Sequence, residues 1–378
     1  MVSNAVWSRL VRRPLALVLR GLDDNDMHTG PLNGLWDRLR VLPLRIDGYR
    51  LKPLQLDTNS GFTRETTVVQ LEGDGQVGSG EDVIWDGPTQ AKFRERGPHL
   101  PLAGAHTLGE FSALLDQLEL TPDPPPVADN AIYRRWAFES AALDLALRQS
   151  GLGIEGALGL TAGPLHFGVS LGLHDFDAIE RRLALHPNMR FKLDATPSWS
   201  VELCEALAAT AAVDVVDFKG AYKGTIVDVA PDLSLYERVL DAMPNVIVED
   251  PHDDTAIHAL LRDRGARIAF DAPIHCFADI AEQGLESSSV NIKPSRFGTL
   301  RALLDAYERC GSQGLSMYGG GQFELGVGRE HIQVLAALFH HDGPNDVAPR
   351  GYHRLESDEL RPASPLLLEL PSVGFALS

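Results

Sequence analysis

Acidic side chains end three successive apolar runs in the second half of the chain. They are Asp217, Glu249 and Asp271. Because the carboxyl ends of parallel strands share one face of a barrel, we expect the three carboxylates to converge there. Converging carboxylates repel one another unless a cation lies between them, and all-oxygen ligands favour Mg²⁺. The sequence therefore predicts a magnesium site, although any one of these acids taken alone could be an ordinary surface residue.

Lysines also lie at or just after the ends of apolar runs. Lys192 and Asp194 end one run, Lys219 follows the first predicted ligand by two residues, and Lys293 ends a later run. Residues two apart on a strand point to the same side, so these groups are candidates for the same pocket. A cation flanked by lysines suits abstraction of a proton next to a carboxylate, since the metal neutralises the charge that develops and a positioned base contributes about 10² to 10⁴ in rate.

Strand-like and helical stretches alternate after residue 163, which indicates a parallel sheet with helical crossovers. An eighth strand near Val347 would make the fold an α/β (β/α)8 TIM-type barrel. The apolar runs are 167–171, 189–193, 213–218, 246–248, 268–270, 290–292 and 315–317.

The part of the chain before the barrel has a different rhythm. Residues 40–85 alternate apolar and polar side chains in short runs, which predicts antiparallel strands, and helical spacing follows. We expect an N-terminal α+β capping domain. The predicted divisions are an N-terminal extension 1–38, the cap 39–155, the barrel 156–350 and a C-terminal segment 351–378 that returns to the cap.

Composition narrows the class of protein. The 378 residues include 34 Lys and Arg against 52 Asp and Glu, a net charge of -18, which argues against binding to nucleic acid or to an anionic membrane surface. Three widely spaced cysteines fit a reducing compartment, so we expect a cytoplasmic protein. The run 15–19 is too short for a membrane-spanning helix.

Several segments between residues 40 and 350 resemble the enolase superfamily, and its muconate-lactonizing branch more than its mandelate-racemase branch. They are 75–81 (GQVGSGE), 135–145 (RWAFESAALDL), 217–222 (DFKGAY), 249–251 (EDP), 290–298 (VNIKPSRFG) and 319–324 (GGGQFE). The resemblance implies a Mg²⁺-dependent enzyme that converts a small-molecule carboxylate through a metal-stabilised enediolate, and a homo-oligomer. It also implies that Arg296, Gln322 and Glu324 bind substrate.

Strand two departs from the family pattern. The family usually has K-x-K there, with the second lysine as base, whereas this chain reads Lys192-Leu193-Asp194 in the better register; the other register reads Arg190-Phe191-Lys192 and keeps Lys192 as base. Lys219 also stands where the family commonly has Asn. We expect Lys293 to act as base or acid, and Asp194 and Lys219 to form an opposite-charge pair that is either catalytic or structural.

With one clear lysine base, the sequence favours β-elimination, as in an acid-sugar dehydratase. Racemisation or epimerisation, and cycloisomerisation of the muconate-lactonizing type, are alternatives. A metal-binding barrel without turnover is another.

Overall fold

The computed structural model describes residues 32–58, 62–172, 176–223, 228–353 and 362–377. Most of the predicted N-terminal extension therefore lies outside the described residues. Its last part contains helix α1 (Leu35–Leu39), in which Leu35 and Leu39 are buried. The Leu35 N–H donates to Glu308 Oε1 at 2.6 Å, which joins this helix to the barrel.

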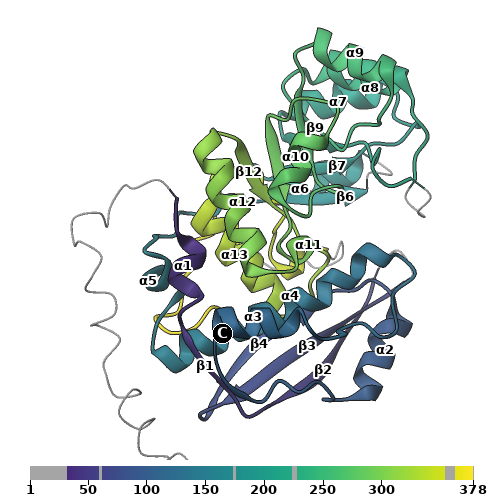
Figure 1. The fold of residues 1–378 in the computed structure, drawn as a ribbon. Helices are drawn as coiled ribbons and strands as arrows, with labels where there is room; N and C mark the ends of the chain where they lie inside the picture. Colours follow the sequence, from purple (N-terminus) through teal and green to yellow (C-terminus); the bar gives the residue numbers. More distant parts are fainter. Residues whose placement is uncertain (1–31, 59–61, 173–175, 224–227, 354–361, 378) are drawn as a thin grey trace, which may run out of the picture.

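The cap consists of two small antiparallel sheets with helices against them, as Figure 1 shows at the end opposite α7–α9. The chain turns between β3 and β4 at Asp74 and Gly75, which both have positive φ (50° and 72°), as a two-residue hairpin turn requires. The elements are β1 (Pro43–Ile46) paired with β5 (Gly104–Thr107), the sheet β2 (Gly48–Asp57), β3 (Thr63–Gly73) and β4 (Gln76–Asp82), and helices α2 (Gly87–Arg96) and α3 (Leu108–Leu115).

The long helix α4 (Ile132–Ser150) packs directly on the cap sheet. Two glycines of β4 make this possible: a Cβ at Gly78 would lie 2.3 Å from Leu145 N, and one at Gly80 would lie 2.0 Å from Ala137 O. The helix ends at Gly151, which adopts the left-handed conformation (φ 66°) typical of a helix C-terminus. α4 thereby joins the cap to the first part of the barrel.

The barrel part is a seven-stranded parallel sheet in sequential order with helices outside it, which confirms the predicted fold class. Each of the seven predicted apolar runs forms or overlaps a strand. The strands are β6 (Gly168–Gly172), β7 (Arg190–Asp194), β8 (Val213–Asp217), β9 (Ile247–Glu249), β10 (Arg267–Phe270), β11 (Ser289–Ile292) and β12 (Ser316–Gly319). The helices are α5 (Ile154–Leu158), α6 (Asp177–Leu185), α7 (Val201–Thr210), α8 (Leu233–Ala242), α9 (Thr255–Asp263), α10 (Phe277–Glu282), α11 (Pro294–Phe297), α12 (Leu300–Gln313) and α13 (Val327–Phe339), with 3₁₀ turns at Ala128–Ala131 and Arg350–His353.

The eighth strand predicted near Val347 is reduced to a single bridge between Phe167 and Asn345. The Gly168 N–H donates to the Asn345 carbonyl at 2.8 Å, and the Asp346 N–H donates to the Gly319 carbonyl at 2.7 Å. The segment therefore bonds to β6 on one side and to β12 on the other. Pro344, which has no N–H to donate, precedes the bridge and keeps it short.

Buried polar side chains reinforce this closure. Asn345 Oδ1 accepts hydrogen bonds from the Gly319 N–H at 2.6 Å and from His340 Nδ1 at 2.7 Å, and its Nδ2 donates to three carbonyl oxygens. Because that oxygen can only accept, the proton of neutral His340 is on Nδ1. His340 Nε2 is then the acceptor for the Tyr307 hydroxyl, which lies 3.5 Å away.

The C-terminal segment 362–377 runs from the barrel to α4. Leu366 bridges to Leu165, and the Phe375 N–H donates to Asp144 Oδ1 at 2.8 Å. The Phe375 ring stacks on the buried ring of His331, with centroids 4.1 Å apart. This segment therefore touches both α4 and α13.

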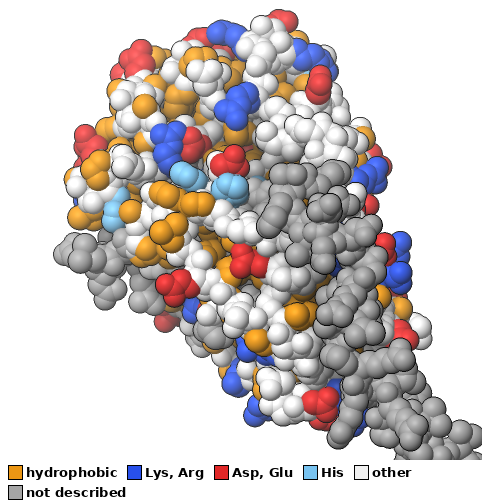
Figure 2. Space-filling view, turned by 90° about the vertical axis from the view of Figure 1, so that its left-hand side faces the viewer, with side chains coloured by type: hydrophobic (Ala, Val, Ile, Leu, Met, Phe, Trp, Pro, Cys, Tyr) orange, Lys and Arg blue, Asp and Glu red, His pale blue; other side chains and the backbone are white. Residues whose placement is uncertain are grey.

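The face in Figure 2 carries acidic and basic side chains interspersed with hydrophobic ones, and histidine side chains gather in its upper half. Charge on this face is mixed and is not collected into one basic patch. Within the described parts of the chain, no helix combines the length and the apolar character that crossing a bilayer requires.

The burial of His340 makes stability depend on pH. Burial lowers its pKa from 6.5 to about 4, so the unfolded chain binds a proton that the folded chain does not, and stability is lost as pH falls below 6.5. Between pH 7 and pH 5 we expect wild type to lose about 2 kcal/mol more than His340→Gln. Urea unfolding at both pH values measures this, with the exposed His166→Gln as control. An unchanged gap between wild type and His340→Gln would contradict it.

Candidate active site

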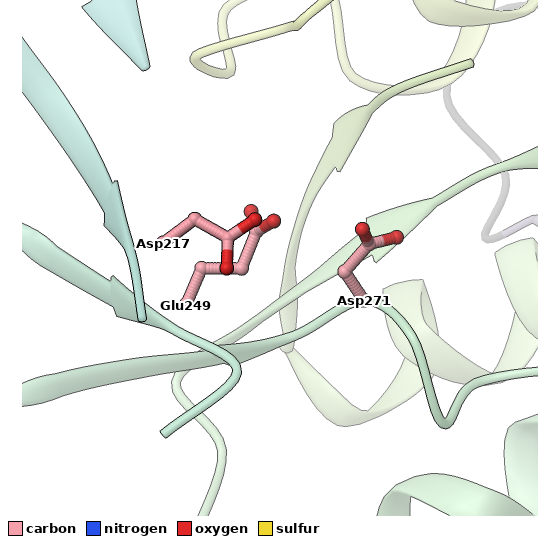
Figure 3. Close-up of side chains that lie close together, drawn as sticks. All are labelled: Asp217, Glu249 and Asp271. Carbon is pink, nitrogen blue, oxygen red and sulfur yellow. The ribbon is translucent and has the colours of Figure 1, made fainter. Parts of the chain in front are cut away.

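The three predicted metal ligands lie together at the carboxyl ends of adjacent strands. Asp217 and Glu249 end β8 and β9 and are paired in register, and Asp271 directly follows β10. One carboxylate oxygen from each lies within 4.8 Å of the others, and all three side chains are buried. Figure 3 shows the carboxylates of Asp217 and Glu249 close together and that of Asp271 on the neighbouring strand.

An apolar layer lies beneath these acids in the barrel interior. Val215, Ile247 and Ala269 each precede one ligand by two residues and form a buried cluster with Tyr318. Alternation along the strands puts the apolar side chain and the acid on the same side of the sheet. The sequence spacing therefore fixes both the floor of the site and the acids above it.

Two cationic side chains hold Asp271. Lys293 Nζ lies 2.8 Å from Asp271 Oδ2, and Arg296 Nη1 lies 3.0 Å from Oδ1. Burial alone would raise the pKa of Asp271, but the Arg296 guanidinium and the Lys293 ammonium outweigh it and hold the pKa well below its usual range. Asp271 is therefore ionised at neutral pH, with Lys293 directly beside it.

Lys192 contacts the other two acids. Its Nζ donates to Glu249 and lies 3.6 Å from Asp217 Oδ2. Burial, with the Asp217 and Asp271 carboxylates nearby, raises the pKa of Glu249 to about 8, although the Lys192 ammonium opposes this. The lysine alone therefore does not compensate the negative charge at Glu249.

The predicted pair of Asp194 and Lys219 is present. Lys219 Nζ lies 3.0 Å from Asp194 Oδ1 and 2.5 Å from Asp217 Oδ2. Lys219 has φ 56°, in the left-handed region that side chains other than those of Gly, Asn and Asp rarely adopt. Arg190 instead pairs with Asp214 at the start of β8, so Lys192 and Asp194 are the strand-two side chains at the site.

Asp250 fixes the backbone that carries Asp271. Its two carboxylate oxygens accept the N–H groups of Asp271 at 2.8 Å and of Ala272 at 2.9 Å. Asp250 has φ 44°, and this second left-handed residue turns its side chain back to the neighbouring strand end. Burial, together with the Asp271 and Asp217 carboxylates, raises the pKa of Asp250 to about 7.

Gln322 and Glu324 lie in the loop between β12 and α13. The Gln322 N–H donates to Glu324 Oε1 at 2.6 Å, and both side chains are buried. The loop begins against Lys293: a Cβ at Gly320 would lie 2.8 Å from Lys293 Cε. Gln322 Nε2 and Glu324 Oε2 have no hydrogen-bond partner within the described chain.

The structure thus joins most of the predicted site residues into one contact network. Sequence reasoning missed the side chains that hold that network in place. Tyr318 OH donates to Glu249, Asn291 Nδ2 lies 3.4 Å from Glu249 Oε2, and Tyr222 OH lies 3.4 Å from Asp271 Oδ2. Asn291 could have been found, because it lies on β11 two residues before Lys293, which continues the strand in extended conformation, so both side chains point to the same side.

The residues present fit a divalent cation. The donor set is all oxygen, as Mg²⁺ prefers, and the raised pKa of Glu249 indicates negative charge that a cation would compensate. Asp217, Glu249 and Asp271 would hold the ion. Lys192 and Lys219 would then give up some of the carboxylate oxygens that they contact here.

Both domains match a family described as a domain of unknown function (DUF8230): its N-terminal domain matches residues 37–157 and its C-terminal domain residues 161–354. An N-succinylamino acid racemase from Amycolatopsis is 31% identical over an alignment of 333 residues that covers 81% of this chain and 86% of that protein. An o-succinylbenzoate synthase from Geobacillus stearothermophilus is 27% identical and covers 85% of this chain and 89% of that protein.

Solved structures share the fold. A member of the enolase superfamily from Listeria innocua superposes with a TM-score of 0.64 at 21% identity, over 82% of this chain and 86% of that one. A muconate lactonizing enzyme from Pseudomonas fluorescens, complexed with muconolactone, gives a TM-score of 0.62 at 20% identity, over 80% and 88% of the two chains.

Mg²⁺ should stabilise the folded protein. At a concentration 100 times its dissociation constant, a ligand that binds only the folded state adds about 2.7 kcal/mol. We expect Asp217→Asn and Glu249→Gln to weaken Mg²⁺ binding more than about 100-fold, since even residues behind a ligand account for about 10- to 100-fold. Titration calorimetry and thermal unfolding with and without Mg²⁺ measure both effects.

Asp214→Asn is the matched control, because Asp214 lies on the same strand as Asp217 but pairs with Arg190 at its other end. It should keep the full response to Mg²⁺. Equal responses in all the variants would show that the ion binds elsewhere.

Proposed function

Since the chain belongs to the enolase superfamily, we propose that it is a Mg²⁺-dependent enzyme that removes the proton α to a carboxylate and then eliminates a β-hydroxyl as water. The observation that carries the proposal is the buried triad Asp217, Glu249 and Asp271, with oxygens within 4.8 Å of one another and Lys293 Nζ 2.8 Å from Asp271. When bound, Mg²⁺ would neutralise the negative charge that develops on the substrate carboxylate.

Lys293 is the proposed base. The residue is 8% exposed, and its side chain comes from the strand end next to Asp271, so it can reach a substrate carboxylate held at the triad. In its neutral form, Lys293 Nζ takes the α-proton. Arg296, fixed on the other oxygen of Asp271, is the proposed partner for a second anionic oxygen of the substrate.

The pair Asp194 and Lys219 is the proposed source of the second proton. As the bond between the β-carbon and the hydroxyl breaks, the Lys219 ammonium donates a proton and the hydroxyl leaves as water. In the register that aligns Asp194 with the usual base position, the proposed second proton comes from the ion pair of Asp194 and Lys219 and not from a lysine at residue 194. This asymmetry favours elimination over two-sided proton transfer.

Racemisation is the second candidate. A similar protein is named N-succinylamino acid racemase, and another, o-succinylbenzoate synthase. Lys219 could serve racemisation by returning a proton to the α-carbon on the face opposite Lys293. A barrel that binds Mg²⁺ without turnover is the third reading.

Proton exchange in D₂O separates these reactions. The protein is incubated with Mg²⁺ and a set of β-hydroxy carboxylates, sugar acids and N-succinylamino acids, and products are followed by NMR and mass spectrometry. Loss of water supports elimination, and deuterium at the α-carbon without loss of water supports racemisation. If no compound exchanges although Mg²⁺ binds, the protein is not an enzyme for these classes and the proposal fails.

Lys293→Met should lower turnover by about 10² to 10⁴, because it removes the base and keeps a side chain of similar length. Lys219→Met and Asp194→Asn should lower elimination by a comparable factor if the pair supplies the second proton. Rates of water loss measure all three, with the exposed Lys52→Met as control. Full turnover in Lys219→Met and Asp194→Asn would leave the pair a structural role only.

A further inference from the structure

Two buried charges of the cap hold the loop that follows β12. They are Arg64 on β3 and Glu81 on β4, which are 1% and 0% exposed. The loop they bind, residues 320–328, begins against Lys293 and carries Gln322 and Glu324. The cap is thereby connected to the site through a few polar groups.

Arg64 binds backbone carbonyl oxygens of the loop and of its own domain. Nε lies 3.3 Å from Phe323 O, and Nη2 lies 2.9 Å from Gln322 O. The other N–H groups donate to Val83 O at 2.7 Å, Ile84 O at 2.9 Å and Glu65 O at 3.1 Å. Burial lowers the pKa of Arg64 to about 10, so it remains charged at neutral pH.

Glu81 binds the N–H groups at the other end of the loop. Its carboxylate accepts from Leu325 at 2.7 Å, Gly326 at 2.8 Å and Gly328 at 2.9 Å, and from the Thr66 hydroxyl at 2.7 Å. These N–H groups lie at the N-terminus of α13, where a negative charge is favourable. A Cβ at Gly328 would lie 3.0 Å from Glu81 Oε2, a tight contact, so the close approach favours glycine.

The backbone of the loop 320–328 is strained, and the loop lies next to Lys293. Phe323, between the two anchoring points, has φ 57°. Trp85 of the cap adds a third contact, since its ring covers the Arg64 guanidinium at 4.3 Å and its Nε1 donates to Gln322 Oε1 at 2.9 Å. That contact leaves Gln322 Nε2 as the donor without a partner.

We infer that Arg64 and Glu81 are positioning residues, which set the conformation of the loop 320–328 and through it the placement of Gln322 and Glu324 against the substrate. The Arg64 guanidinium donates to carbonyl oxygens of the loop, and the Glu81 carboxylate accepts from its N–H groups. Both the acceptors and the donors of the loop backbone are therefore held. A free loop would have to adopt the strained conformation on its own. The loop conformation follows from the structure alone, and its effect on turnover rests on the proposed function.

Glu81→Gln tests the loop conformation without any substrate. The change is nearly isosteric, but the amide NH₂ cannot accept the N–H groups that one carboxylate oxygen now accepts. Hydrogen–deuterium exchange of peptides that cover residues 320–330 should become at least about 10-fold faster. Arg64→Lys, which keeps the charge but not the forked geometry, should have the same effect and serves if Glu81→Gln folds poorly.

Asp82→Asn is the matched control. Asp82 is the next residue on β4, equally buried, and bonds Arg134 and the Ile84 N–H, which are outside the loop. In the Asp82→Asn variant, the peptides that cover residues 320–330 should exchange hydrogen for deuterium at the wild-type rate. Unchanged exchange in Glu81→Gln and Arg64→Lys, or equal acceleration in Asp82→Asn, would overturn the inference about the loop.

Kinetics test the effect on turnover. In Glu81→Gln we expect KM to rise and kcat/KM to fall about 10- to 100-fold with Mg²⁺ affinity unchanged, since misplacement by about 1 Å costs on this order. A purely structural role would lower kcat through loss of folded protein and leave KM alone. Faster loop exchange with unchanged kcat/KM would overturn the link to turnover. Absence of turnover in wild type would refute the proposed function, while the exchange measurement would still decide the loop.

Discussion

The burial of negative charge at the carboxyl ends of β8, β9 and β10 is the constraint on which the site depends. Asp217, Glu249 and Asp271 are almost completely removed from water, and carboxylates this close raise one another's pKa unless cations compensate. The compensation by protein side chains is uneven. Arg296 and Lys293 hold Asp271 ionised, whereas Glu249 keeps a raised pKa despite Lys192. That imbalance is the local reason to expect a divalent cation.

Around this charge, the chain places ammonium groups that come from different strand ends. Lys219, two residues after β8, supplies an ammonium 3.0 Å from Asp194 at the end of β7. The two opposite charges attract each other, and the partial exposure of Asp194 to solvent weakens that attraction. The site therefore has cations on both sides of the triad that come from different strands.

The sequence predicted the residues at strand ends well because their position follows from alternation and from the topology of a parallel barrel. Asp217, Glu249 and Asp271 needed only the spacing of apolar runs to be brought together. Arg64 and Glu81 could not be found this way, because their partners are backbone groups about 240 to 260 residues away, which no side-chain type reveals. The eighth strand is only a single bridge, and Pro344, which has no N–H to donate, directly precedes it.

The backbone at position 219 restricts which residues fit there without strain. A left-handed φ of 56° suits asparagine, whose short polar side chain tolerates it, and penalises lysine by about 1 to 2 kcal/mol. The left-handed turn also places the Lys219 N–H 2.9 Å from Asp217 Oδ1. This backbone hydrogen bond does not depend on which side chain residue 219 carries. The shape of this turn therefore depends on Asp217, and a lysine at position 219 lowers the stability of the fold while it places a positive charge next to that acid.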